Sequence, residues 1–94
     1  MSTNHFGRYI KVRELERKIK ALEGIEILID APNYKLVPDY GYSTKIPNRA
    51  RVYQFFKWRM SLVVLRSFKV TIKRGDGEEV THFTSIGTIR GSYK

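Results

Sequence analysis

Two histidines are the side chains of this 94-residue chain best suited to general acid–base chemistry near neutral pH. His5 lies near the N-terminus, and His82 falls in a segment predicted as a β-strand. The expected register places His82 on one face with Lys69, Thr71 and Lys73, where the histidine could transfer protons and the lysines could bind phosphate. A metal-independent, toxin-like ribonuclease that uses His82 is therefore one alternative function. A single histidine in a strand is more often structural, so we expect no catalytic residue.

Metal and redox chemistry have little support in the composition. The chain has no cysteine, which excludes disulfides and thiolate ligands. The carboxylates of Glu26, Asp30 and Asp39 are oxygen donors of the kind that Mg²⁺ prefers, but their spacing matches no ligand pattern. We therefore predict neither a metal ion nor another cofactor. The absence of cysteine also suits a reducing compartment, so we expect a cytoplasmic protein, or a nuclear one in a cell with a nucleus.

Positive charge is the strongest feature of the composition, and it is unevenly distributed. The chain has 18 Lys and Arg residues against 9 Asp and Glu, a net charge of +9. Residues 1–44 contain seven basic and six acidic residues, whereas residues 45–94 contain eleven basic and three acidic residues. No acid occurs between Asp39 and Asp76. Such a segment creates a positive field that attracts phosphates, and the attraction should weaken steeply with salt.

Residues 51–60 decide where these cations lie, and their pattern permits two structures. As a strand, the segment has an apolar face on its even positions and a basic, aromatic face on its odd positions. As a helix, it would begin after Asn48 and bury a stripe that includes Val52, Phe55 and Met60. Aromatic and β-branched residues favour the strand. The predicted contact residues for nucleic acid are Arg49, Arg51, Tyr53, Phe55, Lys57, Arg59, Lys69, Lys73 and Arg74.

An N-terminal helix is predicted over residues 9–23, because apolar residues recur there every three or four positions. Gly24 follows at the position where a helix often ends in a left-handed residue. Alternating isoleucines then predict a strand over 25–29, with a short partner strand at 34–37. Residues 38–48 carry turn formers without periodicity and are predicted as a loop.

A hairpin is predicted near the C-terminus. Residues 68–73 alternate as a strand, and Gly75-Asp76-Gly77 supplies the residues of a tight turn. A return strand from Glu79 to Ile86 would place Arg74 opposite Glu79 and Val70 opposite Phe83. The apolar run at 62–65 suits a buried strand, and residues 88–90 a further short one.

The expected fold class is α+β, with the N-terminal amphipathic helix packed on a four- to five-stranded, largely antiparallel sheet. We expect a single domain over residues 1–94, in which residues 1–8 form a flexible arm. No segment is long and apolar enough to span a membrane, and the N-terminus lacks the pattern of a signal peptide.

These features predict a small, basic, non-enzymatic protein that binds nucleic acid, RNA or DNA, through the basic face of residues 45–74. Lys and Arg would follow the phosphates while aromatic rings stack on bases. A second alternative is an accessory or inhibitor protein that binds an acidic protein surface, since Arg, Tyr and Trp are enriched at interface hot spots. We expect no membrane partner, because the polar face of the N-terminal helix mixes glutamates with lysines.

Overall fold

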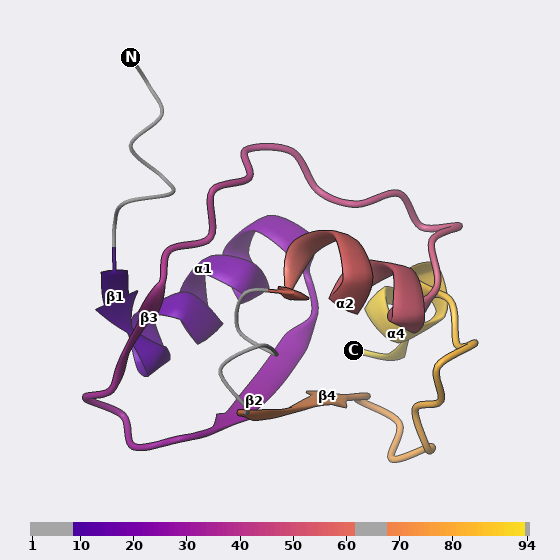
Figure 1. Ribbon diagram of the computed structural model, residues 1–94. Helices are drawn as coiled ribbons and strands as arrows, with labels where there is room; N and C mark the ends of the chain where they lie inside the picture. The colour runs from indigo at the N-terminus through magenta and orange to yellow at the C-terminus, as the bar shows by residue number, and fades with distance from the viewer. Residues whose placement is uncertain (1–8, 62–67, 94) are drawn as a thin grey trace.

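The computed structural model describes residues 9–61 and 68–93, so the expected arm at 1–8 and the expected strand at 62–65 lie outside the described residues. The described part is a small α+β fold (Figure 1). Its elements, in chain order, are β1 (Tyr9–Lys11), α1 (Val12–Glu23), β2 (Glu26–Asp30), β3 (Leu36–Pro38), α2 (Val52–Arg59), β4 (Lys69–Lys73) and α4 (Ile86–Ser92).

Helix α1 confirms the predicted helix from Val12 onward. Its apolar stripe is buried at Val12, Leu15 and Ile19. The helix ends at Gly24, whose φ of 70° is left-handed and whose N–H donates to the carbonyl of Lys20 at 3.0 Å. A side chain at such a φ is strained, so glycine suits this position. Residues 9–11, which were expected to be helical, instead form β1 and pair with β3.

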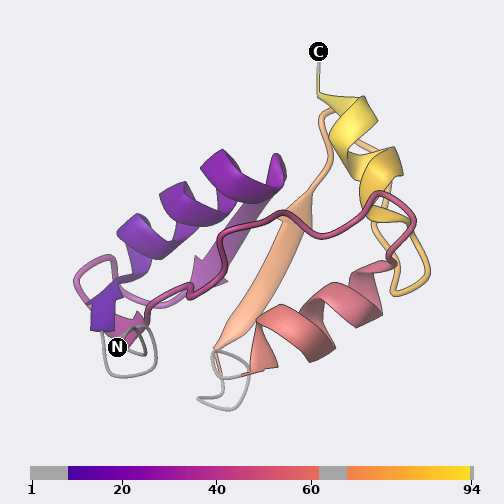
Figure 2. The same cartoon turned by 90° about the horizontal axis from the view of Figure 1, so that it is seen from above.

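Strands β2 and β4 form an antiparallel ribbon that carries the core on one face. Ile27 pairs with Ile72, and both are buried, while the neighbouring positions on β2 are exposed. Helices α1 and α2 lie on the same face of the ribbon, with α1 beside β2 and α2 beside β4 (Figures 1 and 2). Seen in Figure 2, the segment 39–50 runs between α1 and α2 and reaches α4 before α2 begins. One face of the ribbon is therefore covered and the other faces solvent, as expected for this alternation.

The predicted C-terminal hairpin is wrong, because β4 pairs with β2 and not with residues 79–86. The guanidinium of Arg74 binds Asp76 rather than facing Glu79, with N–O distances of 2.9 and 2.6 Å. The N–H of Gly75 donates to the hydroxyl of Ser92 at 2.9 Å, which directs the chain toward α4. The isoleucine-rich β2 offers β4 a larger apolar face than the polar return segment does.

The preferred strand at 51–60 is also wrong, since residues 52–59 form α2. Val52 and Phe55, three positions apart, are buried on its inner side, and Met60 is buried just beyond its end. The Gln54 side chain accepts a hydrogen bond from the Arg51 N–H at 2.8 Å and so helps to begin the helix. Tertiary packing of this stripe thus outweighs the strand propensity of the aromatic residues.

Helix α4 occupies residues 86–92, where a short strand was predicted. The hydroxyl of Ser85 caps it by accepting from the N–H of Thr88 at 3.1 Å, and Ile86 and Ile89 are fully buried. The single sheet of four to five strands is therefore not found among the described residues, which contain two two-stranded sheets. In the same part of the chain, no helix has the length and hydropathy required to cross a bilayer.

Candidate nucleic-acid interface

The segment before α2 presents two arginines to solvent. Residues 48–51 run alongside residues 84–87, held by hydrogen bonds from the N–H of Ile86 to the Ala50 carbonyl (2.8 Å) and from the N–H of Gly87 to the Asn48 carbonyl (2.9 Å). Asn48 and Arg49 lie in a turn, in which the N–H of Ala50 donates to the Pro47 carbonyl at 3.0 Å. Ala50 is buried after this turn, while its neighbours Arg49 and Arg51 are exposed.

The outward side of α2 continues this basic region with aromatic rings. Tyr53 is 44% exposed and Trp58 is 51% exposed, and Lys57 lies one helical turn after Tyr53. The opposite side of the helix carries the buried residues Val52 and Phe55. The packing of those two residues therefore determines which side of α2 faces solvent.

A turn at residues 81–84 places a third ring beside Tyr53. The Thr81 N–H donates to the Thr84 hydroxyl at 3.0 Å, and the Thr84 N–H donates to the Thr81 carbonyl at 3.2 Å. Arg51 donates from its guanidinium to the carbonyl of Phe83 at 2.6 Å. The Phe83 ring is 71% exposed, and its centroid lies 5.9 Å from that of Tyr53 in an edge-to-face arrangement.

We call this set of residues the α2 surface; its members are Arg49, Arg51, Tyr53, Lys57, Trp58 and Phe83. The segments that provide it, residues 40–61 and 80–93, contain no Asp or Glu. Among the described residues, no carboxylate lies within ion-pair distance of its three cations. The α2 surface thus combines unneutralised positive charge with exposed aromatic rings.

Arg59 has a different environment from the three cations of the α2 surface. Its guanidinium donates to the fully buried carboxylate of Glu23 at 2.8 Å, and its side chain is only 14% exposed. Arg90 reaches the same carboxylate at 3.2 Å, and Ile46 donates its N–H at 2.8 Å. Tyr40 also donates its hydroxyl to Glu23. We call this set of residues the Glu23 cluster; it joins α1, the loop, α2 and α4.

Burial shifts the pKa values of two members of the Glu23 cluster, Tyr40 and Arg90. Burial raises the pKa of Tyr40 far above its ordinary value, and the adjacent carboxylate of Glu23 adds to the effect by disfavouring a second negative charge. Burial lowers the pKa of Arg90, although the charge of Glu23 opposes the change. Two guanidinium groups therefore neutralise one carboxylate inside the fold, and Arg59 is engaged internally rather than offered to a ligand.

Four more of the predicted contact residues lie elsewhere. Phe55 is fully buried, because the segment is a helix and not a strand. Lys69 stands opposite Asp30 and Lys73 opposite Glu26 on the solvent face of the ribbon, where unlike charges face one another. Arg74 pairs with Asp76 and holds the pKa of that carboxyl below its usual range. Arg49, Arg51, Tyr53 and Lys57 thus remain exposed on α2 and the segment before it, whereas the remaining five are buried, ion-paired or on the ribbon.

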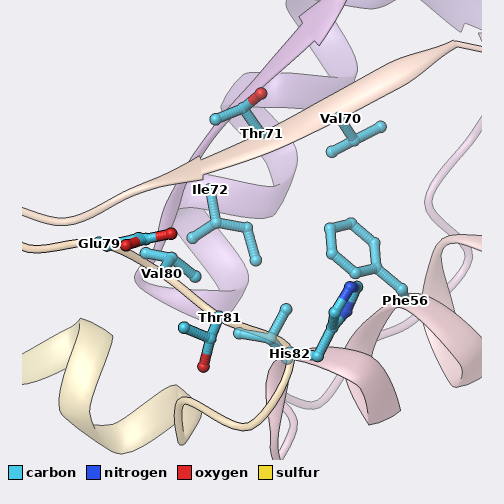
Figure 3. A pocket seen from close by; sticks show the side chains of 9 residues that line it. Phe56, Val70, Thr71, Ile72, Glu79, Val80, Thr81 and His82 are labelled. Atoms are coloured by element: carbon cyan, nitrogen blue, oxygen red, sulfur yellow. The ribbon is translucent and has the colours of Figure 1, made fainter.

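A hollow of about 410 Å³ lies beside β4 and contains the histidine that suggested catalysis (Figure 3). His82 lies next to the ring of Phe56 there, and Glu79 is the other titratable side chain in the lining. Thr71 lines the hollow, but Lys69 and Lys73 do not. The expected phosphate-binding lysines therefore do not line the hollow that His82 lines. Within residues 9–61 and 68–93, no three His, Cys, Asp or Glu side chains are grouped to hold a metal ion.

Sequence reasoning missed Trp58 and Phe83 as exposed rings, since both were assigned to strands. Thr81 and Thr84 were a weak signal, because Thr hydroxyls can hydrogen-bond the nearby backbone in a turn although β-branched residues also suit strands. The Glu23 cluster had no local signal, since its other members lie 17 to 67 residues after Glu23 in the chain.

No protein-family model, curated protein or solved structure matches the chain.

Proposed function

We propose that this protein binds nucleic acid without catalysing a reaction, and that the α2 surface is the contact region. The observation that carries the proposal is the combination, within residues 9–61 and 68–93, of exposed rings with exposed cations that form no ion pair, on segments that contain no acid. Arg49, Arg51 and Lys57 would contact phosphates, while Tyr53, Trp58 and Phe83 would contact bases or sugars.

The placement of the charge supports nucleic acid over an uncharged partner. Cations without nearby carboxylates repel one another, and a bound polyanion reduces that repulsion. Binding also releases the counterions that surround the nucleic acid, which favours the complex. On the solvent face of the β2–β4 ribbon, by contrast, lysines stand opposite carboxylates. A polyanion therefore gains more at the α2 surface than on the ribbon.

Binding of the purified protein to labelled oligonucleotides, measured by fluorescence anisotropy over a salt series, tests the proposal. Three phosphate contacts predict that log K falls with log salt concentration with a slope of about −2 for a single strand. Poly-glutamate of similar charge serves as a probe for an acidic protein surface. Tighter binding to poly-glutamate than to every RNA and DNA probe would refute a nucleic-acid function and favour the acidic-protein alternative.

A further inference from the structure

We infer that the nucleic acid bound by the α2 surface is an unpaired strand, and that its bases stack on the rings of Tyr53 and Phe83. The inference rests on the proposed function, because it names the form of nucleic acid that the same surface binds. Bases in a duplex are stacked on one another and present only their edges, whereas unpaired bases present open faces to aromatic rings.

Phe83 is held in an exposed position before any ligand arrives. Phe83 is 71% exposed. Hydrogen bonds between Thr81 and Thr84 restrain this turn, and the Arg51 guanidinium fixes the Phe83 carbonyl. Tyr53 is tied to the same turn, because its N–H donates to the His82 carbonyl at 3.0 Å. These hydrogen bonds hold the backbone that carries both rings, so that backbone loses little conformational freedom on binding.

The angle between the two rings distinguishes an unpaired strand from a duplex. The ring planes of Tyr53 and Phe83 are inclined by 67°, with centroids 5.9 Å apart. Bases stacked on both rings would therefore be steeply inclined to each other. Successive base pairs of a duplex are nearly parallel, so a duplex cannot place a base on each ring. A flexible single strand can turn between the two bases and satisfy both.

Cations flank the ring pair at positions suited to the backbone of such a strand. Arg51 uses one guanidinium nitrogen to bind the Phe83 carbonyl, which leaves other N–H groups available to a phosphate. Lys57 lies four residues after Tyr53, which is about 6 Å along the helix axis. Arg51 precedes Tyr53 and Lys57 follows it in the chain, so cations on both sides of this ring would contact the phosphates of a strand whose bases stack there.

An abasic strand separates stacking from charge attraction. The measurement compares the dissociation constants of the wild-type protein for a 12-nucleotide DNA strand, its RNA equivalent, the matching duplex and an abasic DNA strand of equal length. The abasic strand has the same phosphates but no bases. We expect it to bind on the order of 5- to 150-fold more weakly for each lost stack, with the duplex also weaker than the single strand.

Ring variants locate the stacking. Phe83→Ala and Tyr53→Ala should each reduce affinity for the base-containing strand on the order of 5- to 150-fold and leave affinity for the abasic strand unchanged. Phe83→Leu, which keeps an apolar side chain without a ring, should resemble Phe83→Ala. Tyr34→Ala is the matched control, since Tyr34 is 75% exposed but lies outside the α2 surface. Thermal unfolding of each variant verifies that it is folded.

The outcomes separate this inference from the proposed function. Equal, salt-sensitive binding to the normal and abasic strands, with no effect of the ring variants, would overturn base stacking while leaving polyanion binding in place. Tighter binding of the duplex would overturn the preference for an unpaired strand. Failure to bind any probe at low salt would overturn both proposals.

Discussion

The guanidinium of Arg59, on the last turn of α2, lies 2.8 Å from the carboxylate of Glu23, on the last turn of α1. The contact joins two helices through residues that are 36 positions apart in sequence. It also removes one cation from the basic segment that distinguishes this chain. The structure therefore divides the arginines of α2 and its preceding segment into one that stabilises the fold and others that face solvent.

Removing the charge of Glu23 should strongly destabilise the protein. Glu23→Gln leaves two largely buried guanidinium groups without their counter-charge, a change that costs about 3–5 kcal/mol when one partner of a buried ion pair is lost. Urea denaturation measures the loss in the free energy of unfolding. The control is Glu78→Gln, at an exposed residue, which should change stability by less than about 0.5 kcal/mol. Similar stabilities for the two variants would contradict the structural role of Glu23.

Arg59→Ala should mainly reduce the stability of the protein, whereas Arg51→Ala should mainly reduce its affinity for nucleic acid. Arg59→Ala breaks the buried ion pair and the contact of its guanidinium with the Tyr42 ring, 4.4 Å away, so it should cost about 3 kcal/mol of stability. Arg51→Ala should cost less than about 1 kcal/mol but weaken nucleic-acid binding. Parallel unfolding and anisotropy measurements on folded protein check both expectations. A binding defect for Arg59→Ala as large as that for Arg51→Ala would contradict this division.

Two glycines should respond oppositely to alanine. A Cβ at Gly75 would meet the Ser92 carbonyl oxygen and lie 2.8 Å from the Cα of Tyr93, so Gly75→Ala should cost on the order of 3 kcal/mol. Gly91, in α4, has no atom within 4 Å of the added carbon and no positive φ. Gly91→Ala should therefore stabilise the protein by about 0.5–1 kcal/mol. Thermal unfolding would show a lower midpoint for the first variant and a higher one for the second; the reverse order would contradict the close approach of Gly75 to Ser92 and Tyr93.

Alkaline pH should destabilise the protein through Tyr40. Its pKa is raised in the folded state, so above the ordinary value near 10 the unfolded chain loses the proton while the folded chain keeps it. Stability from this group is complete below pH 10 and falls as pH rises above it, by up to about 1.4 kcal/mol per pH unit. Urea denaturation between pH 9 and about 11 should show a shallower decline for Tyr40→Phe than for the wild type. Identical declines would exclude this contribution.

Local patterns in the sequence predict the elements that local physics dominates. The stripe and terminal glycine of α1 identify that helix, and the alternating isoleucines identify β2. The pairing of β4 was mispredicted because the turn at Gly75 and Asp76 suggested a neighbouring partner. The actual partner lies about 40 residues earlier in the chain. Which strand pairs with β4 depends on the packing of the whole core, and no short stretch of sequence contains that information.

The candidate site was predicted in its charge but not in its geometry. The acid-free segment identifies a basic region, and Arg49, Arg51 and Lys57 remain exposed in the fold. The strand prediction placed Phe55 and Arg59 together on the exposed face. Side chains repeat every 2 residues in a strand and every 3.6 residues in a helix, so the helix orients the same residues differently. Only the folded chain shows Glu23 reaching Arg59 and the 81–84 turn placing Phe83 beside Tyr53.

The most direct test of the account compares two variants that each lose three positive charges. Arg49→Ala/Arg51→Ala/Lys57→Ala removes the cations of the α2 surface, and Lys11→Ala/Arg13→Ala/Arg17→Ala removes three exposed cations from β1 and α1. Anisotropy titrations of a single strand over a salt series give the slope of log K against log salt. We predict that the first variant binds weakly, with a slope reduced in magnitude by about 2, and that the second stays close to the wild type. Equal losses in both variants would contradict binding at the α2 surface.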